Sequence, residues 1–361
     1  MAKIIFVISR MDVGGAEKIF RELAIGLAGD SGFYDVTLLC LYGRGKLASG
    51  LEEKGIKVYE NIVRSRFDLA GFLRFAGILR KVKPDILYIA GQPLSQAAGA
   101  IGALFVKIPV KILGFHSHNL AHRPFYKSLI DKISILSADK IVCVSESQKR
   151  HISAGKKLKP GKIKVIYNGV DINKFKPGKK AAEGDKVVIG TVGSLRREKG
   201  LDVLLSAAPA VLKKCPSAYF LIVGDGMEKD FLLGLAKKLG IEDRVDFLGQ
   251  RDGVENIIPR FDVACSSSRT ESFPVSMLEY MSCGKAIVAT AVGGVPEIVK
   301  DSVNGFLVRS ECPEALAEKL IYMIENQELR ASLGANGRRM AEEYFTLDKM
   351  LENYKALFGD M

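Results

Sequence analysis

Short apolar runs alternate with longer helix-patterned segments along almost the whole chain, and this alternation restricts the folds open to it. Most of these runs are apolar at nearly every position, as in strands that are buried on both faces of a parallel sheet. The expected fold class is therefore α/β, with doubly wound parallel sheets. The runs predict strands at residues 4–8, 36–41, 57–60, 86–89, 111–114, 140–144, 164–167, 187–192, 218–223, 245–248, 263–266, 286–289 and 306–308.

One segment interrupts this alternation. Residues 171–186 carry two glycines, a proline and mixed charge without an apolar period, which is typical of a connection between domains. A chain of 361 residues also suits two domains rather than one. We expect a first domain at 1–170, the connection at 171–186, a second domain at 187–345 and an amphipathic helix at 346–361. Two doubly wound domains in tandem bind ligands in a cleft at the carboxyl ends of their strands.

Basic residues are concentrated in the first half of the chain. Residues 1–170 contain 27 Lys and Arg against 13 Asp and Glu, whereas residues 171–361 contain 26 against 28. This excess predicts an anionic partner such as a membrane, a lipid phosphate or nucleic acid. Residues 64–83 are basic and amphipathic, which fits either a helix seated on a membrane or a core helix with a basic outer side. We expect no nucleic acid, because the familiar binding motifs are missing and the second half would stay unexplained.

No apolar stretch has the length of a membrane span. The longest, residues 97–106, is half of the roughly 20 residues that a span needs, and the first apolar run is too short for a signal peptide. The six cysteines are scattered through apolar segments without Cys-x-x-Cys spacing, as in a reducing cytoplasm. We therefore expect a cytoplasmic protein, held at the inner face of the membrane if its basic half binds lipid.

Glu271 and Glu279 lie eight positions apart and flank a Phe-Pro pair. Proline suits a first helical position and glycine suits a helix end, so a helix is predicted to begin at Pro274 and to stop at Gly284. A helix N-terminus binds phosphate, and carboxylates on its two sides bind hydroxyls. A sugar–diphosphate–ribose presents its groups in this order. Taken alone, a pair with this spacing is more often a solvated loop charge and a solvated helix charge.

Two glycine-rich loops follow predicted strands. Gly14 and Gly15 open a helix after the first strand, where backbone can approach a ligand closely. This loop lacks the G-x-G-x-x-G pattern and a Walker lysine, which argues against a dinucleotide or ATP site. The loop at 193–200 places Arg196, Arg197 and Lys199 between two glycines, and three cations in that position suit a pyrophosphate or a solvated basic loop.

These motifs resemble those of the retaining glycosyltransferases of family 4, which have the GT-B architecture and include bacterial and archaeal enzymes of surface-polysaccharide synthesis. The resemblance extends to Ser266-Ser-Ser-Arg-Thr-Glu-Ser-Phe-Pro, Met277-Leu-Glu-Tyr-Met and Gly293-Gly-Val-Pro-Glu297. It implies two Rossmann-like domains, the first for the acceptor and the second for the nucleotide sugar, with the terminal helix packing on the first. The donor-binding residues that it implies are Gly14, Gly15, Gly193, Arg197, Gly224, Gly249, Arg251, Ser272, Phe273, Pro274, Val275 and Glu279.

The resemblance also implies roles at the reacting centre. Lys199 neutralises the departing diphosphate, Glu271 orients the donor sugar and Glu279 holds the ribose. The family usually has arginine where this chain has Ser194, so a second phosphate contact falls to Arg196 or to the arginine that follows it.

A histidine from the first domain is implied to contact the donor sugar. His116 is the better match to the family position and His118 is the alternative. Two histidines at this spacing are able to ligate a metal, but no third ligand is evident, which disfavours a metal site. The histidine that does not contact the sugar is expected to be a hydrogen-bonded loop residue.

The reaction implied is transfer of a hexose or N-acetylhexosamine from a nucleotide diphosphate sugar to a hydroxyl of a lipid-linked or surface glycan. No D-x-D motif is present, so we expect metal-independent activity without a cofactor, with a UDP-sugar favoured and a GDP-sugar as the alternative. Two other readings stay open: a non-catalytic nucleotide-sugar-binding protein and a differently reacting GT-B enzyme such as an epimerase. A phosphorylase is disfavoured because no lysine has a recognisable pyridoxal phosphate context.

Overall fold

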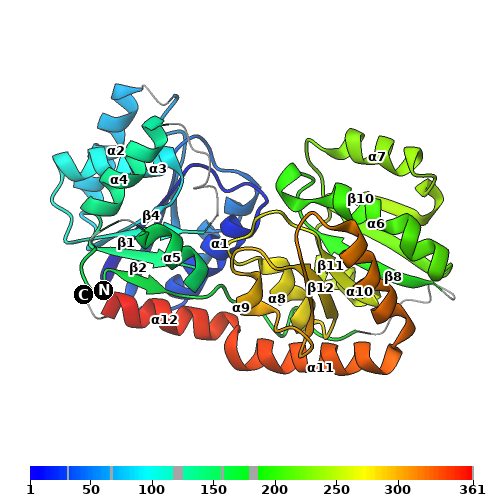
Figure 1. The fold of residues 1–361 in the computed structure, drawn as a ribbon. Helices are drawn as coiled ribbons and strands as arrows, with labels where there is room; N and C mark the ends of the chain where they lie inside the picture. The colour runs from blue at the N-terminus through cyan, green and yellow to red at the C-terminus, as the bar shows by residue number, and fades with distance from the viewer. Residues whose placement is uncertain are drawn as a thin grey trace. The chain divides into compact units, whose positions relative to one another are not determined.

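The computed structural model describes residues 1–359 except 31, 66–67, 117–124, 155, 157 and 179–185. The chain divides into two compact units, Met1–Asn168 with Asp348–Met361, and Gly169–Leu347. Each unit has one parallel sheet, which confirms the α/β fold class (Figure 1). His118 and residues 179–185 of the expected connection lie outside the described residues.

The first unit holds a seven-stranded sheet in the order β3-β2-β1-β4-β5-β6-β7. Every strand pair in it is parallel. The elements of this unit are β1 (Ala2–Ile8), α1 (Gly15–Ala28), β2 (Tyr34–Cys40), β3 (Lys57–Tyr59), α2 (Leu69–Val82), β4 (Ile86–Ala90), α3 (Pro93–Phe105), β5 (Val110–Phe115), α4 (Phe125–Ser137), β6 (Lys140–Cys143), α5 (Glu146–Ser153), β7 (Ile163–Val165) and α12 (Leu347–Gly359).

The second unit holds a six-stranded parallel sheet in the order β10-β9-β8-β11-β12-β13. All the predicted strands of both units are present within two residues of their expected ends. The elements are β8 (Val187–Val192), η3 (Arg197–Lys199), α6 (Leu201–Lys214), β9 (Ala218–Val223), α7 (Lys229–Lys238), β10 (Val245–Gly249), β11 (Val263–Ser266), α8 (Val275–Ser282), β12 (Ala286–Thr290), α9 (Val295–Ile298), β13 (Gly305–Val308), α10 (Pro313–Glu325) and α11 (Gln327–Tyr344).

The amphipathic segment at 64–83 contains helix α2, which begins after Asp68 because that side chain accepts a hydrogen bond from Gly71 N at 2.8 Å. Phe72 and Phe75 on one side of the helix are buried in the core of the first unit. On the other side Leu73 is 61% exposed. The prediction that this segment is a core helix is therefore confirmed for one face of α2. On the opposite face, apolar side chains are exposed.

The terminal helix α12 packs on the first unit. Its Tyr354 is buried there beside Tyr88 of β4, with ring centroids 5.9 Å apart, and its Lys355 forms an ion pair with Asp30. Burial of a large aromatic ring stabilises such packing by about 2 kcal/mol. In the part of the chain that the structure describes, no helix is long and apolar enough to cross a bilayer.

Candidate functional site

The sheet of the second unit changes winding direction between β8 and β11. These strands are neighbours in the sheet, yet β8 also pairs with β9 on one side and β11 with β12 on the other. The loops that follow β8 and β11 therefore lead to helices on opposite sides, which leaves room between them at the carboxyl ends of the strands.

Glycines let the loop after β8 lie close against its neighbours. A Cβ at Gly224, whose φ is +142°, would lie 1.8 Å from the carbonyl oxygen of Gly193. A Cβ at Gly200, whose φ is +59°, would lie 2.1 Å from the carbonyl oxygen of Ser267. Only glycine fits at either position, because larger residues would collide with backbone atoms. The loop from Gly193 to Gly200 is thereby held against the loop after β11.

Helix α8 follows the second loop and confirms the predicted helix, with one correction to its start. Pro274 has an extended ψ of 121°, so it caps the helix and Val275 is the first helical residue. At the other end Gly284 has a φ of +68°, and its N–H donates to Met281 O at 2.9 Å. The N–H of Lys285 donates to Tyr280 O, also at 2.9 Å, which completes the glycine-based helix end that the sequence predicts.

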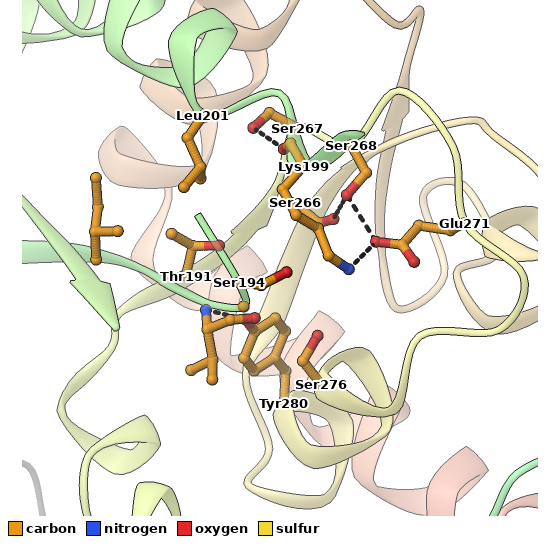
Figure 2. A pocket seen from close by; sticks show the side chains of 13 residues that line it. Thr191, Ser194, Lys199, Leu201, Ser266, Ser267, Ser268, Glu271, Ser276 and Tyr280 are labelled. Carbon is orange, nitrogen blue, oxygen red and sulfur yellow. Dashed lines mark hydrogen bonds and ion pairs between the residues drawn. The ribbon is translucent and has the colours of Figure 1, made fainter. Parts of the chain in front are cut away.

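A pocket lies where β8, β11 and the start of α8 meet (Figure 2). Most of its lining side chains carry a hydroxyl group, and the only charged ones in the described lining are Lys199 and Glu271. The hydroxyl-bearing residues are Thr191, Ser194, Ser266, Ser267, Ser268, Ser276 and Tyr280. Such a lining offers many hydrogen-bond donors and acceptors, as a polyhydroxylated or phosphorylated ligand requires.

Lys199 and Glu271 form an ion pair in this pocket. Nζ of Lys199 lies 2.5 Å from Oε1 of Glu271, and the Ser268 hydroxyl donates to the same oxygen at 2.8 Å, as Figure 2 shows. The Glu271 side chain is 11% exposed and the Lys199 side chain 29%. The pair therefore lies in a partly desolvated setting, where charge–charge interactions are stronger than at the open surface.

In the first unit, the switch of winding direction falls between β1 and β4. Ser9 lies directly after β1, and its hydroxyl is hydrogen-bonded to the Ser95 hydroxyl at 3.2 Å. The N–H of Ser9 donates to Oε1 of Gln92 at 3.0 Å. The nearby helix α1 begins at Gly15 with Gly14 as an extended cap. These groups occupy the carboxyl ends of the central strands, where an α/β unit binds ligands.

His116 directly follows β5 in the first unit. Its Nε2 lies 3.0 Å from the Tyr88 hydroxyl, and its ring packs against Phe20 with centroids 4.8 Å apart. The side chain as a whole is partly exposed, but Nδ1 is enclosed. Burial lowers the pKa of His116 from 6.5 to about 4, so the imidazole is neutral at pH 7.

Two family models together match most of the chain. Glycosyltransferase Family 4 matches residues 13–174, and Glycosyl transferases group 1 matches residues 172–340. Both halves of the chain are glycosyltransferase family domains. The change from one model to the other falls close to the boundary between the two structural units, which is at residues 168 and 169.

Individual relatives agree with this assignment. N-acetyl-alpha-D-glucosaminyl L-malate synthase of Bacillus anthracis is 27% identical over 349 residues, which cover 87% of this chain and 88% of that protein. A glycosyltransferase of Haemophilus influenzae is 28% identical over 365 residues, 99% of this chain and all of that protein. Among solved structures, HepE of Anabaena in complex with UDP and glucose superposes with a TM-score of 0.85 at 24% identity, covering both chains completely. This likeness shows that the fold is GT-B.

The structure places the predicted site residues of this glycosyltransferase in three settings. Three of them line the pocket: Gly193, Lys199 and Glu271. Others are buried beside it, namely Ser272, Phe273, Pro274 and Glu279. The remaining members of the second unit lie outside the lining of the pocket, with the three arginines exposed: Arg196, Arg197, Arg251, Gly224, Gly249 and Val275.

Arg196 and Arg197 are both exposed to solvent, so the second phosphate contact predicted for one of them stays a prediction. The pocket residue at the usual arginine position is Ser194. The sequence motifs did not identify the hydroxyl lining of the pocket, including Ser276 and Tyr280. A recognisable signal was the density of hydroxyl residues in the Ser266-Ser-Ser run and at the start of α8.

Metal ligation has no structural support in the described residues, which contain no group of three or more His, Cys, Asp or Glu placed to hold an ion. The cysteines are buried, apart from the partly exposed Cys312.

Arg269 connects the two loops that carry Lys199 and Glu271. Its guanidinium binds Asp202 through two hydrogen bonds, of 2.8 and 2.7 Å, and donates to Arg197 O at 2.8 Å. Its Nε pairs with Glu311, and its own N–H donates to Glu198 O at 2.8 Å. The bidentate bond to Arg269 also lowers the pKa of Asp202. Arg269 thereby holds the loop after β8 against the loop after β11.

Replacing Arg269 by alanine is expected to lower both stability and donor turnover. Charge-assisted hydrogen bonds contribute about 1.5–3 kcal/mol each, and partial exposure places the loss near 2 kcal/mol in total. Loosening of the two loops is expected to lower kcat/KM at least tenfold per folded molecule. Urea unfolding and steady-state kinetics measure the two effects separately.

Arg330 supplies the matched control for this prediction. It lies in the same unit and donates to Met323 O and Ile324 O at 2.8 and 2.7 Å, at the junction of α10 and α11. Arg330→Ala should lower stability while leaving kcat/KM of the folded protein unchanged. Equal kinetic effects of the two substitutions would show that Arg269 contributes to stability alone.

The low pKa of His116 makes the stability of the first unit depend on pH. Between pH 6.5 and about 4 the unfolded chain binds a proton that the folded chain does not, so stability falls as the pH falls through this window. The expected loss reaches about 3 kcal/mol at pH 4, from 1.36 kcal/mol per pKa unit. Urea unfolding of wild type and His116→Gln from pH 7.5 to 4 measures this contribution as the difference between the two curves. Parallel curves would contradict it.

Proposed function

We propose that the protein is a retaining glycosyltransferase that moves a hexose or N-acetylhexosamine from a nucleotide diphosphate sugar to an acceptor hydroxyl. The observation that carries this proposal is the pairing of Lys199 with Glu271 in a hydroxyl-lined pocket beside the N-terminus of α8. A cation and the N–H groups at a helix N-terminus favour phosphate, while a carboxylate and serine hydroxyls favour a sugar. The membership of both halves in glycosyltransferase families supports the same reading.

The proposed reaction breaks the bond from sugar C1 to the phosphate oxygen and forms a bond from C1 to the acceptor oxygen on the same face. The acceptor proton passes to the departing diphosphate. Because C1 carries positive charge in such a transition state and the diphosphate gains negative charge, catalysis depends on stabilising the leaving group. We assign this task to Lys199 and to the first N–H groups of α8. Glu271 orients the sugar, Glu279 binds the ribose hydroxyls and His116 contacts the sugar.

Donor binding in this scheme separates Lys199 from Glu271. The diphosphate replaces the carboxylate as the partner of the ammonium group, and the carboxylate turns to the sugar hydroxyls. We propose that this exchange operates without a divalent metal ion. A UDP-sugar is the favoured donor and a GDP-sugar the alternative, and the N-acetylglucosaminyl transfer named for the Bacillus anthracis relative supports an N-acetylhexosamine among the sugars tested.

We further propose that the acceptor is a lipid-linked or surface glycan and that the first unit contacts an anionic membrane at the inner face of the cell membrane. The outer side of α2 supports this, since it combines exposed Leu69 and Leu73 with exposed Arg74, Arg80 and Lys81. Apolar side chains among basic ones are typical of segments that bind the membrane interface.

The test is release of nucleoside diphosphate from UDP- and GDP-hexoses and N-acetylhexosamines, with lipid-linked glycan acceptors, in buffer with and without EDTA. The proposal expects acceptor-dependent release that survives EDTA and a product whose anomeric configuration, measured by proton NMR, equals that of the donor. Binding of a nucleotide sugar without release would favour a non-catalytic binding protein. Inversion of configuration or a change in the sugar itself would favour another reaction of the same fold.

A further inference from the structure

Three side chains from distant parts of the chain form a hydrogen-bonded row in the first unit. The Tyr354 hydroxyl of α12 lies 3.1 Å from the Tyr88 hydroxyl of β4, which lies 3.0 Å from Nε2 of His116. Tyr88 and Tyr354 are 266 positions apart, and both are fully buried, with exposed fractions of 0% and 1%. The row therefore connects the terminal helix to the histidine assigned to the donor sugar.

Burial fixes the direction of the protons in this row. A buried hydroxyl proton needs an acceptor, and leaving it without one costs about 1–3 kcal/mol. Among the described residues, the Tyr354 hydroxyl has one hydrogen-bond partner, the hydroxyl of Tyr88. Each direction leaves one proton unpaired among the described residues: that of Tyr354 if Tyr88 donates to Tyr354, and that of Nδ1 in the opposite direction. Tyr354 is 1% exposed, so no ligand is able to reach its proton, whereas His116 is partly exposed and a ligand is able to supply an acceptor to Nδ1. Tyr354 therefore donates to Tyr88, and Tyr88 donates to Nε2 of His116.

This direction determines which nitrogen of His116 carries the proton. A neutral imidazole has one donor nitrogen and one acceptor nitrogen. Since Nε2 accepts from Tyr88, the proton resides on Nδ1. That atom is enclosed and has no partner among the described residues. Within the described part of the chain this buried N–H has no acceptor, and an oxygen atom of a bound ligand is able to supply one.

We propose that Tyr354 and Tyr88 are positioning residues that hold His116 as the Nδ1–H tautomer, so that Nδ1–H donates to an oxygen atom of the bound substrate. The statement that the accepting oxygen belongs to the substrate rests on the proposed glycosyltransferase function. The assignment of the tautomer does not depend on that function. An oxygen of a sugar hydroxyl or of the sugar ring is the chemical class that fits. The neutral imidazole offers it one uncharged N–H group, which donates one hydrogen bond. The terminal helix thereby contributes a residue that acts on the histidine without touching the substrate.

Nitrogen-15 NMR of histidine-labelled full-length protein at pH 7 tests the tautomer directly, with His116→Gln identifying the signal. The wild-type ring should be protonated at Nδ1. Tyr88→Phe, which keeps the ring and removes the donor, should shift the proton toward Nε2. A wild-type ring protonated at Nε2 would overturn the proposal, as would a Tyr88→Phe spectrum identical to wild type.

Tyr34→Phe is the matched control. Tyr34 lies in the same unit and packs against Phe358 of α12 with ring centroids 6.4 Å apart, outside the row. This substitution should leave the His116 signal unchanged, and a change equal to that in Tyr88→Phe would overturn the specific role of the row. Circular dichroism and Tm establish that each variant is folded.

Kinetics separates this proposal from the proposed function. Tyr88→Phe and Tyr354→Phe should each lower kcat about tenfold, the effect of losing about 1.4 kcal/mol in the transition state, with donor KM within twofold of wild type. If His116 is protonated at Nδ1 but the protein has no transferase activity, the proposed function is wrong and the tautomer assignment is still correct. Full activity in both variants would overturn the positioning role.

Discussion

Lys199→Ala is expected to lower kcat/KM for the nucleotide sugar about 10²–10³-fold, the largest single effect in the second unit. Removing one preorganised charge that stabilises a leaving group typically has this magnitude. The ammonium group lies in the pocket with its side chain only 29% exposed, so water replaces it poorly. Most of the loss should fall on kcat, because the diphosphate gains charge as the bond to the sugar breaks.

The structure offers a matched control for this substitution. Lys319 on α10 pairs with exposed Glu318 at 3.2 Å, and Lys319→Ala removes a similar charge away from the pocket. It should leave kcat/KM within twofold of wild type. The double variant with Glu271→Gln adds a further test, because two residues in direct contact show non-additive effects. If the losses in kcat/KM of Lys199→Ala and Glu271→Gln are additive, or if Lys199→Ala has no larger effect than Lys319→Ala, Lys199 does not act in the site.

Glu279→Ala is expected to raise donor KM about 100-fold with a smaller change in kcat. The carboxylate is 2% exposed on α8, and a buried charged acceptor gains about 1.5–3 kcal/mol from each hydroxyl that it binds. A loss near 3 kcal/mol corresponds to about 100-fold in affinity. Steady-state kinetics over a range of donor concentrations separates KM from kcat.

Glu279→Gln is the companion variant, because it preserves shape and one acceptor oxygen while removing the charge. It should raise KM by about tenfold, between wild type and the alanine variant, at near-wild-type Tm. Since alanine leaves space in a buried position, its Tm must be measured as well. A donor KM unchanged in the glutamine variant, with folding intact, would show that the nucleotide does not contact this carboxylate.

The central strands of both units were predictable because they are almost continuous apolar runs, a pattern that follows from burial on both faces. The edge strands β3 and β7 are shorter, contain a lysine and are only partly buried. The helix after β11 was predictable for a different reason. Proline restricts φ locally and glycine permits a positive φ, so Pro274 and Gly284 set the limits of α8 to within two residues.

The arrangement of the site was harder to predict, since it depends on contacts between distant segments. Lys199 and Glu271 are 72 positions apart, and their ion pair follows from the neighbouring placement of β8 and β11 in the sheet. Sequence motifs identified both residues but not the pair. The exposure of Arg196 and Arg197 likewise depends on how η3 turns, which charge spacing does not determine. The row from Tyr354 to His116 lacks any local signal at all.

Calorimetric titration of the full-length protein with UDP and GDP, repeated with Lys199→Ala, tests most directly whether the pocket of the second unit binds a nucleotide diphosphate. In the presence of EDTA, one equivalent of one nucleotide is expected to bind to the wild-type protein, and its binding to Lys199→Ala is expected to be at least tenfold weaker. Lys319→Ala should bind like wild type. No binding of either nucleotide, or equal affinity of wild type and Lys199→Ala, would contradict it.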